Sequence, residues 1–506
     1  MLIALLCSAY LSGCSGQETP RYEGPYKHVL FVSLDTVRAD QIGCYGGEQA
    51  KTPSIDGVAR EGVRFAQVTA AASTTLHSHT SMMTGLYGRR HGVVRNGFMV
   101  PRENVMLAEV LAEQGFHTAA VIGSFALDRM FDFNQGFAHF DQEFDIEFSP
   151  LLADQNQRRA EQVTDAALAH LDEIGEVERL FLFTHYFDAH AAYDPPSPFA
   201  EEYALPGGPT ASDMQMLSTQ VVKHQQRSTG KVRDVFNLGL SKGLARDVDG
   251  EPIAGDAELA ALYAGELAYL DHHLGRLLEG LDKRGYLEDC LVVIVSDHGE
   301  TFWEHGDFWH HGAWVYETNV HVPMILRLPD GRGRAGVVED PVSGTDLFPT
   351  LLDLLEIPLP EPVDGISLAA AVDGAALPER PIFSEGTQPI TNVEHLFKWG
   401  GQLKPKSIRL GKWKYIQAPY LRGVRLEELF DLEADPGERV NLAIHPTAES
   451  PAQLKRLLGR LDEWREVEDP RTAVFNPTQS QAVLDRLKAL GYTGKGELQD
   501  EAEDGE

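Results

Sequence analysis

Side chains of the types that bind metal ions stand just after three apolar runs of this sequence. Asp35 and Thr36 follow the first run, His190 comes soon after another, and Asp297 and His298 follow the last. A single aspartate in such a place is usually a turn former or a cap, but three runs that deliver ligand types together favour a shared site. Carboxylates and an imidazole that converge make a site for a divalent cation. We therefore predict a metal site that includes Asp35, Asp297 and His298.

The apolar runs themselves indicate the scaffold of this site. They cover residues 28–34, 118–122, 180–183 and 291–295 without a polar face, as expected of strands buried on both sides of a parallel sheet. Between them lie segments with helical spacing of apolar residues, most clearly over 259–281. Strands that alternate with helices predict an α/β fold with a mostly parallel central sheet flanked by helices. Ligands bind such sheets at the carboxyl ends of the strands, where the polar residues stand.

The chain of 506 residues is longer than one hydrophobic core usually covers, so we expect two domains. After residue 360 a hairpin pattern and one helix replace the earlier alternation, which predicts a smaller C-terminal α+β domain. The predicted divisions are a signal and lipoprotein segment at 1–14, a tether at 15–27, a catalytic domain at 28–360 with an insertion at about 201–255, the α+β domain at 361–492, and an acidic disordered tail at 493–506.

The overall charge narrows the range of partners. A formal net charge of -32 at pH 7 repels nucleic acid and anionic membrane surfaces, so neither is expected as a direct partner. The four cysteines show no metal-binding spacing and are too few for a disulfide scaffold. We expect Cys44 and Cys290 to be free thiols.

The N-terminal segment resembles a bacterial export signal. Residues 1–12 are apolar but too few to span a bilayer as a helix. Leu11–Cys14 resembles a lipobox, in which the signal is cleaved before a lipid-modified cysteine. The segment departs from that pattern because no basic residue precedes Arg21. We expect an exported protein at the periplasmic face or outer membrane of a bacterium, attached to the membrane only through a lipid on Cys14.

Several motifs together resemble the sulfatase family of the alkaline phosphatase superfamily. Residues 33–40 are similar to the family's first metal motif, and residues 295–300 are similar to its second. Thr84-Gly85 matches the end of the motif that carries the family's nucleophile, and Arg89–Gly92 matches the turn that follows it. Residues 430–436 resemble the C-terminal signature. The resemblance implies the predicted α/β architecture and an ester hydrolase.

The position of the family's nucleophile departs from the usual pattern. Sulfatases carry Cys or Ser there, oxidised to formylglycine, with Pro two residues later and Arg four residues later. Aligned on Thr84-Gly85, this sequence has Thr75 instead, with His77 for the Pro and His79 for the Arg. Threonine cannot yield an aldehyde because its Cβ already bears a methyl group, so no formylglycine is expected. We predict that Thr75 is the nucleophile and a metal ligand; the alternative is that Thr75 merely caps its helix.

The resemblance also implies roles for residues around Thr75. Asn96 falls near the anion-contacting Asn of related phosphonate monoester hydrolases, and His190 resembles the family's substrate-facing His. His310 or His311 stands where relatives protonate the leaving group, and we choose His311. The predicted catalytic residues are Thr75, His79, Asn96, His190 and His311, and the predicted metal ligands are Asp35, Thr36, Thr75, Asp297 and His298.

The number of metal ions is left open by the sequence. Relatives with two ions need a further Asp and two further His, and Asp188, His190 and His310 or His311 are candidates. The short spacing between Asp188 and His190 disfavours that set, so we expect one divalent ion. Manganese, calcium or zinc would suit the predicted ligands.

We predict a metal-dependent hydrolase of phosphate, phosphonate or sulfate esters that acts through Thr75. The substrate would be a small-molecule or glycan- or lipid-linked anionic ester. An ester on threonine cannot leave by re-forming an aldehyde, so water must attack phosphorus or sulfur, which favours phosphoryl chemistry. The alternatives are a sulfatase proper, a phosphoryl transferase, and a catalytically silent binding protein of the family.

Overall fold

The computed structural model describes most of the predicted catalytic domain and much of the C-terminal one. The described residues are 22–144, 157–190, 193–205, 256–302, 304–305, 311–312, 314–387, 404–421, 424–466 and 471. The predicted signal segment with Cys14, most of the tether, residues 206–255 of the insertion, His310 and the acidic tail lie outside these ranges. Export and lipid attachment therefore stay predictions.

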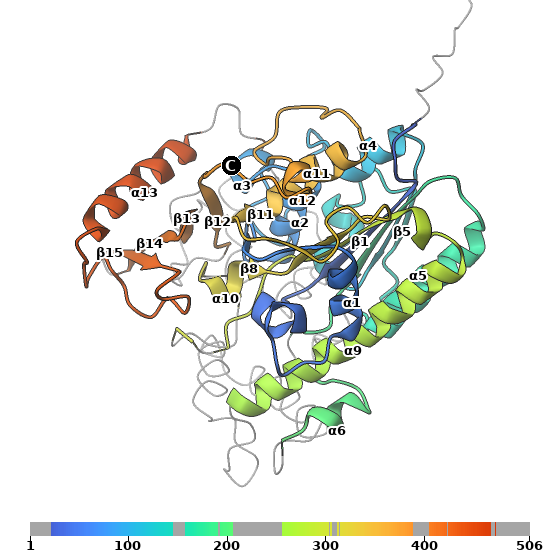
Figure 1. Ribbon diagram of the computed structural model, residues 1–506, viewed down its shortest axis with the longest axis horizontal. Coiled ribbons are helices and arrows are strands. Elements are labelled where there is room, and N and C mark those ends of the chain that lie inside the picture. Colours follow the sequence, from blue (N-terminus) through green and yellow to red (C-terminus); the bar gives the residue numbers. More distant parts are fainter. Residues whose placement is uncertain are drawn as a thin grey trace, which may run out of the picture.

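A mixed sheet of eight strands forms the centre of the molecule (Figure 1), in the order β10-β2-β9-β7-β1-β6-β4-β5. Its five strands from β7 to β5 are parallel to one another, and β9 runs antiparallel to both of its neighbours. The predicted mostly parallel α/β sheet is thus confirmed. The strands are β1 (His28–Leu34), β2 (Val63–Phe65), β4 (His117–Ile122), β5 (His139–Asp141), β6 (Leu180–Tyr186), β7 (Cys290–Ser296), β9 (Met324–Arg327) and β10 (Gly336–Val338).

Helices cover both faces of this sheet, which explains why its central strands are apolar throughout. Alternate residues of β1, such as Phe31 and Val32, belong to two separate hydrophobic cores. The core that contains Phe31 is shared with α2 (Thr75–Thr84), α4 (Leu107–Glu113) and α11 (Leu347–Leu354). The core that contains Val32 is shared with α1 (Pro53–Glu61), α5 (Ala160–Ile174) and α9 (Asp256–Lys283).

Strand β6 is longer than its apolar run predicts. The run ends at Phe183, but the strand continues to Tyr186 because its last residues pair with β1. His185 therefore lies inside the strand, opposite Ser33 in the parallel register. Both residues belong to the face of the sheet on which α2 packs.

Two smaller sheets complete the fold. A three-stranded sheet, β11-β3-β8, lies beside the large one, and a separate antiparallel sheet, β12-β13-β14-β15, carries α13 on one side (Figure 1). The predicted smaller α+β unit is therefore present, with its first strand at Ile382, whereas Leu368 and Val372 still pack in the core of the large sheet. These elements are β3 (Val68–Thr69), β8 (His321–Val322), β11 (Val342–Ser343), β12 (Ile382–Glu385), β13 (Lys406–Leu410), β14 (Trp413–Leu421), β15 (Val424–Asp431) and α13 (Ser450–Arg465).

Cys44 and Cys290 are free thiols, as predicted. Burial raises the pKa of the Cys290 thiol to about 12, so the thiol is protonated and inert at neutral pH. Within the described ranges, every helix is too short or too polar to cross a membrane.

Candidate active site

The predicted metal ligands meet where β1 and β7 end side by side. Leu34 and Ser296 are paired in the register of these strands, so Asp35 and Asp297 leave the sheet at the same level. One carboxylate oxygen of Asp297, Oδ1, accepts hydrogen bonds from the backbone N–H groups of Thr36, at 3.3 Å, and His298, at 2.7 Å. These two bonds fix the carboxylate and leave its second oxygen available.

Three ligand-type side chains surround a common point in this group. His298 Nε2 lies 3.7 Å from Asp35 Oδ1 and 3.5 Å from Asp297 Oδ2, and all three side chains have 0% of their surface exposed. Among the described residues, both oxygens of Asp35, Oδ2 of Asp297 and Nε2 of His298 have no hydrogen-bond partner. Buried polar atoms normally have partners. The ligands of one zinc-like ion lie roughly 3 to 3.5 Å apart, given metal–ligand bonds of about 2 Å, so these residues fit a divalent ion.

The electrostatics of the group point the same way. Burial raises the pKa of Asp35 to about 7, and burial together with the neighbouring Asp35 raises the pKa of Asp297 well above its usual range. Burial also lowers the pKa of His298 well below its ordinary value. Without a cation the interior thus favours neutral groups, and a bound divalent ion would reverse this preference by stabilising both carboxylates.

Thr36 has an unusual backbone conformation. Its φ angle is 57°, a left-handed value that is costly for a β-branched residue. Tyr263 supports it by donating a hydrogen bond to its carbonyl oxygen at 2.9 Å. The buried Thr36 Oγ1 has no partner within the described part of the chain, which is compatible with its predicted role as a ligand.

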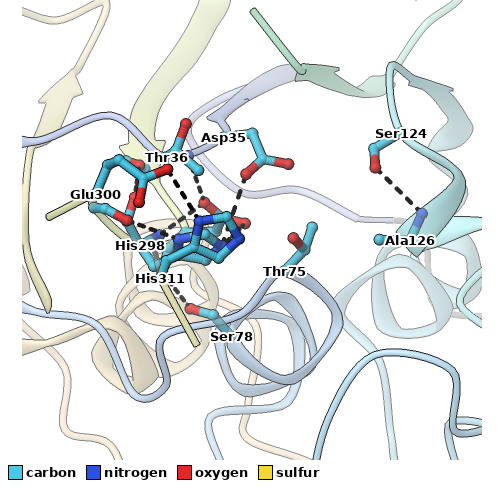
Figure 2. A network of polar contacts seen from close by, with 12 residues as sticks. Asp35, Thr36, Thr75, Ser78, Ser124, Ala126, His298, Glu300 and His311 are labelled. Carbon is cyan, nitrogen blue, oxygen red and sulfur yellow. Dashed lines mark hydrogen bonds and ion pairs between the residues drawn. The ribbon is translucent and has the colours of Figure 1, made fainter. Parts of the chain in front are cut away.

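Thr75 is the first residue of α2, and its side chain lies beside the metal group (Figure 2). The N-cap position belongs to Thr74, whose side chain makes no capping hydrogen bond, so Thr75 does not serve as the cap. Ser78 donates a hydrogen bond to the carbonyl oxygen of Asp297 at 2.6 Å and so ties the helix to the end of β7. The positive end of the helix therefore lies at the metal group, where it favours an anion.

Asn96 lies at this same end of α2. Its Oδ1 accepts a hydrogen bond of 2.7 Å from the backbone N–H of Leu76, and its side chain is buried. Its Nδ2 has no partner among the residues described. Asn96 thus fixes the helix start, and the two N–H groups of its Nδ2 are compatible with the predicted contact to an anion.

Two of the predicted catalytic histidines lie together beside His298. The rings of His190 and His311 are 5.0 Å apart, and those of His311 and His298 are 4.5 Å apart. His311 Nδ1 lies 3.1 Å from Glu300 Oε2. Burial lowers the pKa of His311, but the charge and hydrogen bond of Glu300, together with the charges of Asp35 and Asp297, outweigh burial and raise it overall. A raised pKa is the direction that a general acid needs.

His79 is also at the metal group, whereas Asp188 is not part of it. His79 Nδ1 lies 3.5 Å from Asp297 Oδ2. Asp188 instead lies 3.8 Å from Arg159, and with His190 and Glu266 it lines a separate small cavity. The set of Asp188, His190 and His311 considered for a second ion therefore does not converge around one point in the way that Asp35, Asp297 and His298 do.

Two residues of the site were missing from the predicted set. Glu300 belongs to the second metal motif, three residues after Asp297, and this spacing could have indicated a role. Its burial beside His311, which gives it that role, cannot be read from the sequence. His185 lies inside β6, two residues beyond the predicted apolar run. The extension of the strand by pairing with β1 brings His185 Nε2 to 3.4 Å from Asp35 Oδ2.

Comparison with known proteins agrees with this fold. Residues 27–357 match the model of the sulfatase family, and residues 303–466 match the model described as N-sulphoglucosamine sulphohydrolase, C-terminal. The chain therefore belongs to the sulfatase family of hydrolases, in the alkaline phosphatase-like superfamily, as its motifs indicated.

Individual relatives extend over most of the chain at low identity. An arylsulfatase of Clostridium perfringens is 24% identical over 82% of this chain and 90% of its own length. An N-acetylglucosamine-6-O-sulfatase of Bacteroides thetaiotaomicron is 22% identical over 91% of this chain and 90% of its own length. The crystal structure of a phosphonate monoester hydrolase of Agrobacterium radiobacter superposes with a TM-score of 0.63 at 21% identity, covering 87% of this chain and 95% of that one.

Proposed function

We propose that this protein is a metal-dependent hydrolase of phosphate, phosphonate or sulfate esters that uses Thr75 as its nucleophile. The observation that carries the proposal is the position of Thr75, a hydroxyl at the positive end of α2 beside Asp35 and His298 (Figure 2). A neighbouring hydroxyl, an anion-favouring helix end and a buried metal-type ligand group are what ester hydrolysis by an alkoxide requires.

The metal would be held by Asp35, Asp297 and His298, with Thr75 and Thr36 as further ligands. When bound, a divalent ion lowers the pKa of a neighbouring hydroxyl and polarises the oxygens of the ester. Manganese, zinc and calcium all accept carboxylates, and the nitrogen of His298 favours manganese or zinc.

Other residues of the site would bind the ester, attack it and transfer the proton to the leaving group. The N-terminus of α2 and the Nδ2 donor of Asn96 would hold the anionic oxygens of the ester. Thr75 Oγ would form a bond to phosphorus or sulfur as its proton passes to solvent, and the bond to the leaving oxygen would break. His311, whose pKa Glu300 raises, would give a proton to that oxygen. Water would then cleave the ester on Thr75 and release the inorganic anion.

Phosphate and phosphonate esters fit this chemistry better than sulfate esters. A threonine ester has no aldehyde to re-form, so the second step needs direct attack of water on phosphorus or sulfur. Phosphoryl intermediates on hydroxyl nucleophiles are widely used by enzymes. The similarity to a phosphonate monoester hydrolase supports this choice, whereas the arylsulfatase and the N-acetylglucosamine-6-O-sulfatase support sulfate esters, including those on sugars.

Turnover of matched 4-nitrophenyl esters tests the proposal. The sulfate, the phosphate, the phenylphosphonate and the bis(4-nitrophenyl) phosphate would be compared in manganese, zinc and calcium, for wild type, Thr75→Ala, Thr75→Ser and Thr80→Ala. Thr80 is a suitable control because it is a buried threonine of the same helix whose hydroxyl bonds only locally, to the carbonyl oxygen of Leu76.

We expect Thr75→Ala to reduce kcat by about 10⁴-fold or more. Thr75→Ser should retain part of the activity, and Thr80→Ala should retain most of it. Metal-dependent turnover that is unchanged in Thr75→Ala would overturn the nucleophile. If only the sulfate ester is turned over, the enzyme is a sulfatase proper. Binding of these esters without turnover would favour the silent binding protein.

A further inference from the structure

A second group of ligand-type side chains adjoins the first. It consists of His79 on α2, His185 at the end of β6, and Asp297, which also belongs to the first group. One ligand atom from each of the three lies within 4.8 Å of the other two, and all three residues are buried. Both groups therefore share Asp297 and differ in their nitrogen donors.

His185 is the most informative member of this second group. Its side chain is fully buried, and neither ring nitrogen has a hydrogen-bond partner in the described part of the chain. Nε2 lies 3.4 Å from Asp35 Oδ2, which also has no hydrogen-bond partner there. Burying an imidazole and a carboxylate without hydrogen-bond partners destabilises the folded state, because each group has lost its hydrogen bonds to water. A cation between them would satisfy both.

His79 is oriented from two sides. Its Nε2 lies 2.6 Å from Ser33 Oγ, and its Nδ1 lies 2.7 Å from the carbonyl oxygen of Thr75 and 3.5 Å from Asp297 Oδ2. If Nε2–H donates to Ser33, the lone pair of Nδ1 faces two oxygens that also carry lone pairs. Metal-binding histidines commonly donate their second N–H to an oxygen in this manner, and the ion removes the repulsion on the other side.

The strand register explains why these residues meet. Ser33 and His185 are paired across β1 and β6, so their side chains lie on the same face of the sheet. Helix α2 packs on that face, and the rings of His79 and His185 lie 5.0 Å apart. The two histidines are thus supplied by a strand and a helix that the core holds rigidly, as a preformed site requires.

We propose that His79, His185 and Asp297 bind a second divalent ion next to the first, with Asp297 bridging the two. The two nitrogen donors favour a transition metal, zinc or manganese, over calcium or magnesium. Two-metal hydrolytic sites place their ions about 3.5 to 4 Å apart, a separation that one shared carboxylate can span. Two divalent ions on the carboxylates of Asp35 and Asp297 leave excess positive charge, which suits a dianionic ester. The proposal deepens the proposed function and rests on it only for the first ion.

Metal stoichiometry tests this proposal without reference to turnover. Protein dialysed with zinc and then freed of loosely bound ions would be analysed for bound metal per chain. We expect two ions for wild type and one for His185→Ala and His79→Ala. His273→Ala is the matched control, because His273 is a buried histidine of α9 that contacts Arg276, and it should keep two ions.

Magnetic coupling provides a second readout on the unaltered protein. Manganese-loaded wild type should show the spectrum of two spin-coupled ions by electron paramagnetic resonance, and His185→Ala should show that of an isolated ion. One ion per chain in wild type, or an unchanged count in both histidine variants, would overturn the proposal. In that case the His79 ring carries its proton on Nδ1, donates from it to the carbonyl oxygen of Thr75, and accepts a hydrogen bond from the Ser33 hydroxyl at Nε2.

Thr75→Ala separates the two proposals. It should keep the second ion, because the second group does not include the Thr75 side chain, and Asp35, Asp297 and His298 remain to hold the first. Two ions together with undiminished turnover in Thr75→Ala would overturn the nucleophile and support the second site. One ion in wild type together with loss of turnover in Thr75→Ala would overturn the second site and support Thr75 as the nucleophile.

Discussion

Two buried clusters of charged residues in this protein are built on opposite principles. In the lysine cluster, Lys414 Nζ of β14 lies 2.7 Å from Glu317 Oε1 and 2.8 Å from Glu438 Oε1, and Arg409 lies 3.5 Å from Glu317 Oε2. Glu317 begins the short helix α10 (Glu317–Val320). In the metal cluster, formed by the two ligand groups around Asp35 and Asp297, the carboxylates face only imidazoles among the residues described.

Glu317 and Asp35 are equally buried but have opposite pKa shifts, whereas Glu438 of the lysine cluster resembles Asp35, with a pKa raised to about 7 by burial. Burial alone would raise the pKa of Glu317, but Lys414 and Arg409 outweigh it and hold the pKa at about 2. Burial raises the pKa of Asp35 to about 7, because the charge of His311 opposes burial only in part and the ion-pair contacts of Asp35 among the described residues are with histidines alone. The lysine cluster is neutralised from within, which indicates a structural role. The metal cluster lacks such neutralisation among the described residues, as expected of a functional site that would bind a cation from outside.

The largest expected effect on stability is that of Lys414→Met. Removing one partner of a buried ion pair leaves uncompensated charge, which costs about 3 to 5 kcal/mol. Urea unfolding with and without a chelator would measure the loss, which should be the same in both conditions. Lys412→Met is the control, since Lys412 lies on the same hairpin but pairs with Asp431 at a partly exposed position. The unfolding midpoint of this variant should be nearly that of wild type. A loss that depends on metal would break the contrast between the clusters.

Metal removal should have a comparable effect, confined to the metal cluster. At a free-ion concentration about 1,000 times Kd, binding adds about 4 kcal/mol to stability. Wild type should therefore melt at a lower temperature after chelation, whereas Asp35→Asn, which lacks a ligand, should respond much less. An equal response of both proteins would place the stabilising ion elsewhere.

The metal-free protein should also show an unusual pH dependence. The pKa of Asp35 is about 7 in the folded chain and near the ordinary 3.8 when unfolded, so the folded state binds more protons between these values. The contribution of Asp35 to stability is therefore greatest below about pH 4 and falls as pH rises to 7, by about 4 kcal/mol. Asp35→Asn should flatten this fall in the presence of chelator. A wild type whose stability does not fall over that range would show that a group of the chain already compensates the carboxylate.

Glu300→Gln should produce a smaller, purely kinetic change. Glu300 raises the pKa of His311, and a general acid is lost as pH rises through its pKa. The alkaline limb of the kcat profile should therefore lie about one pH unit lower in the variant than in wild type. An unshifted limb would exclude His311 as the acid and leave His190, whose ring lies 5.0 Å away.

The smallest effect is expected for Thr36→Gly. Glycine relieves the left-handed strain at this position, so the metal-free protein should gain about 1 kcal/mol. If Thr36 Oγ1 is a ligand as predicted, the same change should weaken metal binding, which titration calorimetry would detect. Unchanged affinity would show that Thr36 is not a ligand and would restrict the metal cluster to its carboxylates and imidazoles.

Long, strongly patterned elements of the fold could be predicted from the sequence, and short ones could not. The buried runs that became β1 and β7 and the apolar spacing of α9 carry clear signals because many residues repeat one pattern. Strands such as β3 and β8 have only two residues each, and their positions depend on pairing partners far away in the chain.

The candidate site divides in the same way. Asp35, Asp297 and His298 could be placed because they directly follow two long apolar runs, which became β1 and β7. Glu300 and His185 could not be given roles, because their surroundings are set by a loop and by the register of β6 with β1. Motifs supply the residue types of a site, whereas burial and the identity of the partner are properties of the folded chain.

The hydrogen bond from the Thr36 backbone to Asp297 joins positions 261 residues apart in the chain. It can form only after β7 has aligned with β1, and contacts between such distant positions are slow to form during folding. A chain still emerging from the ribosome, with residue 297 not yet made, would hold Asp35 without the neighbour that orients it. Capture of the proposed ion would thus be a late event in the life of each molecule, and bound metal would mark a chain that has finished folding.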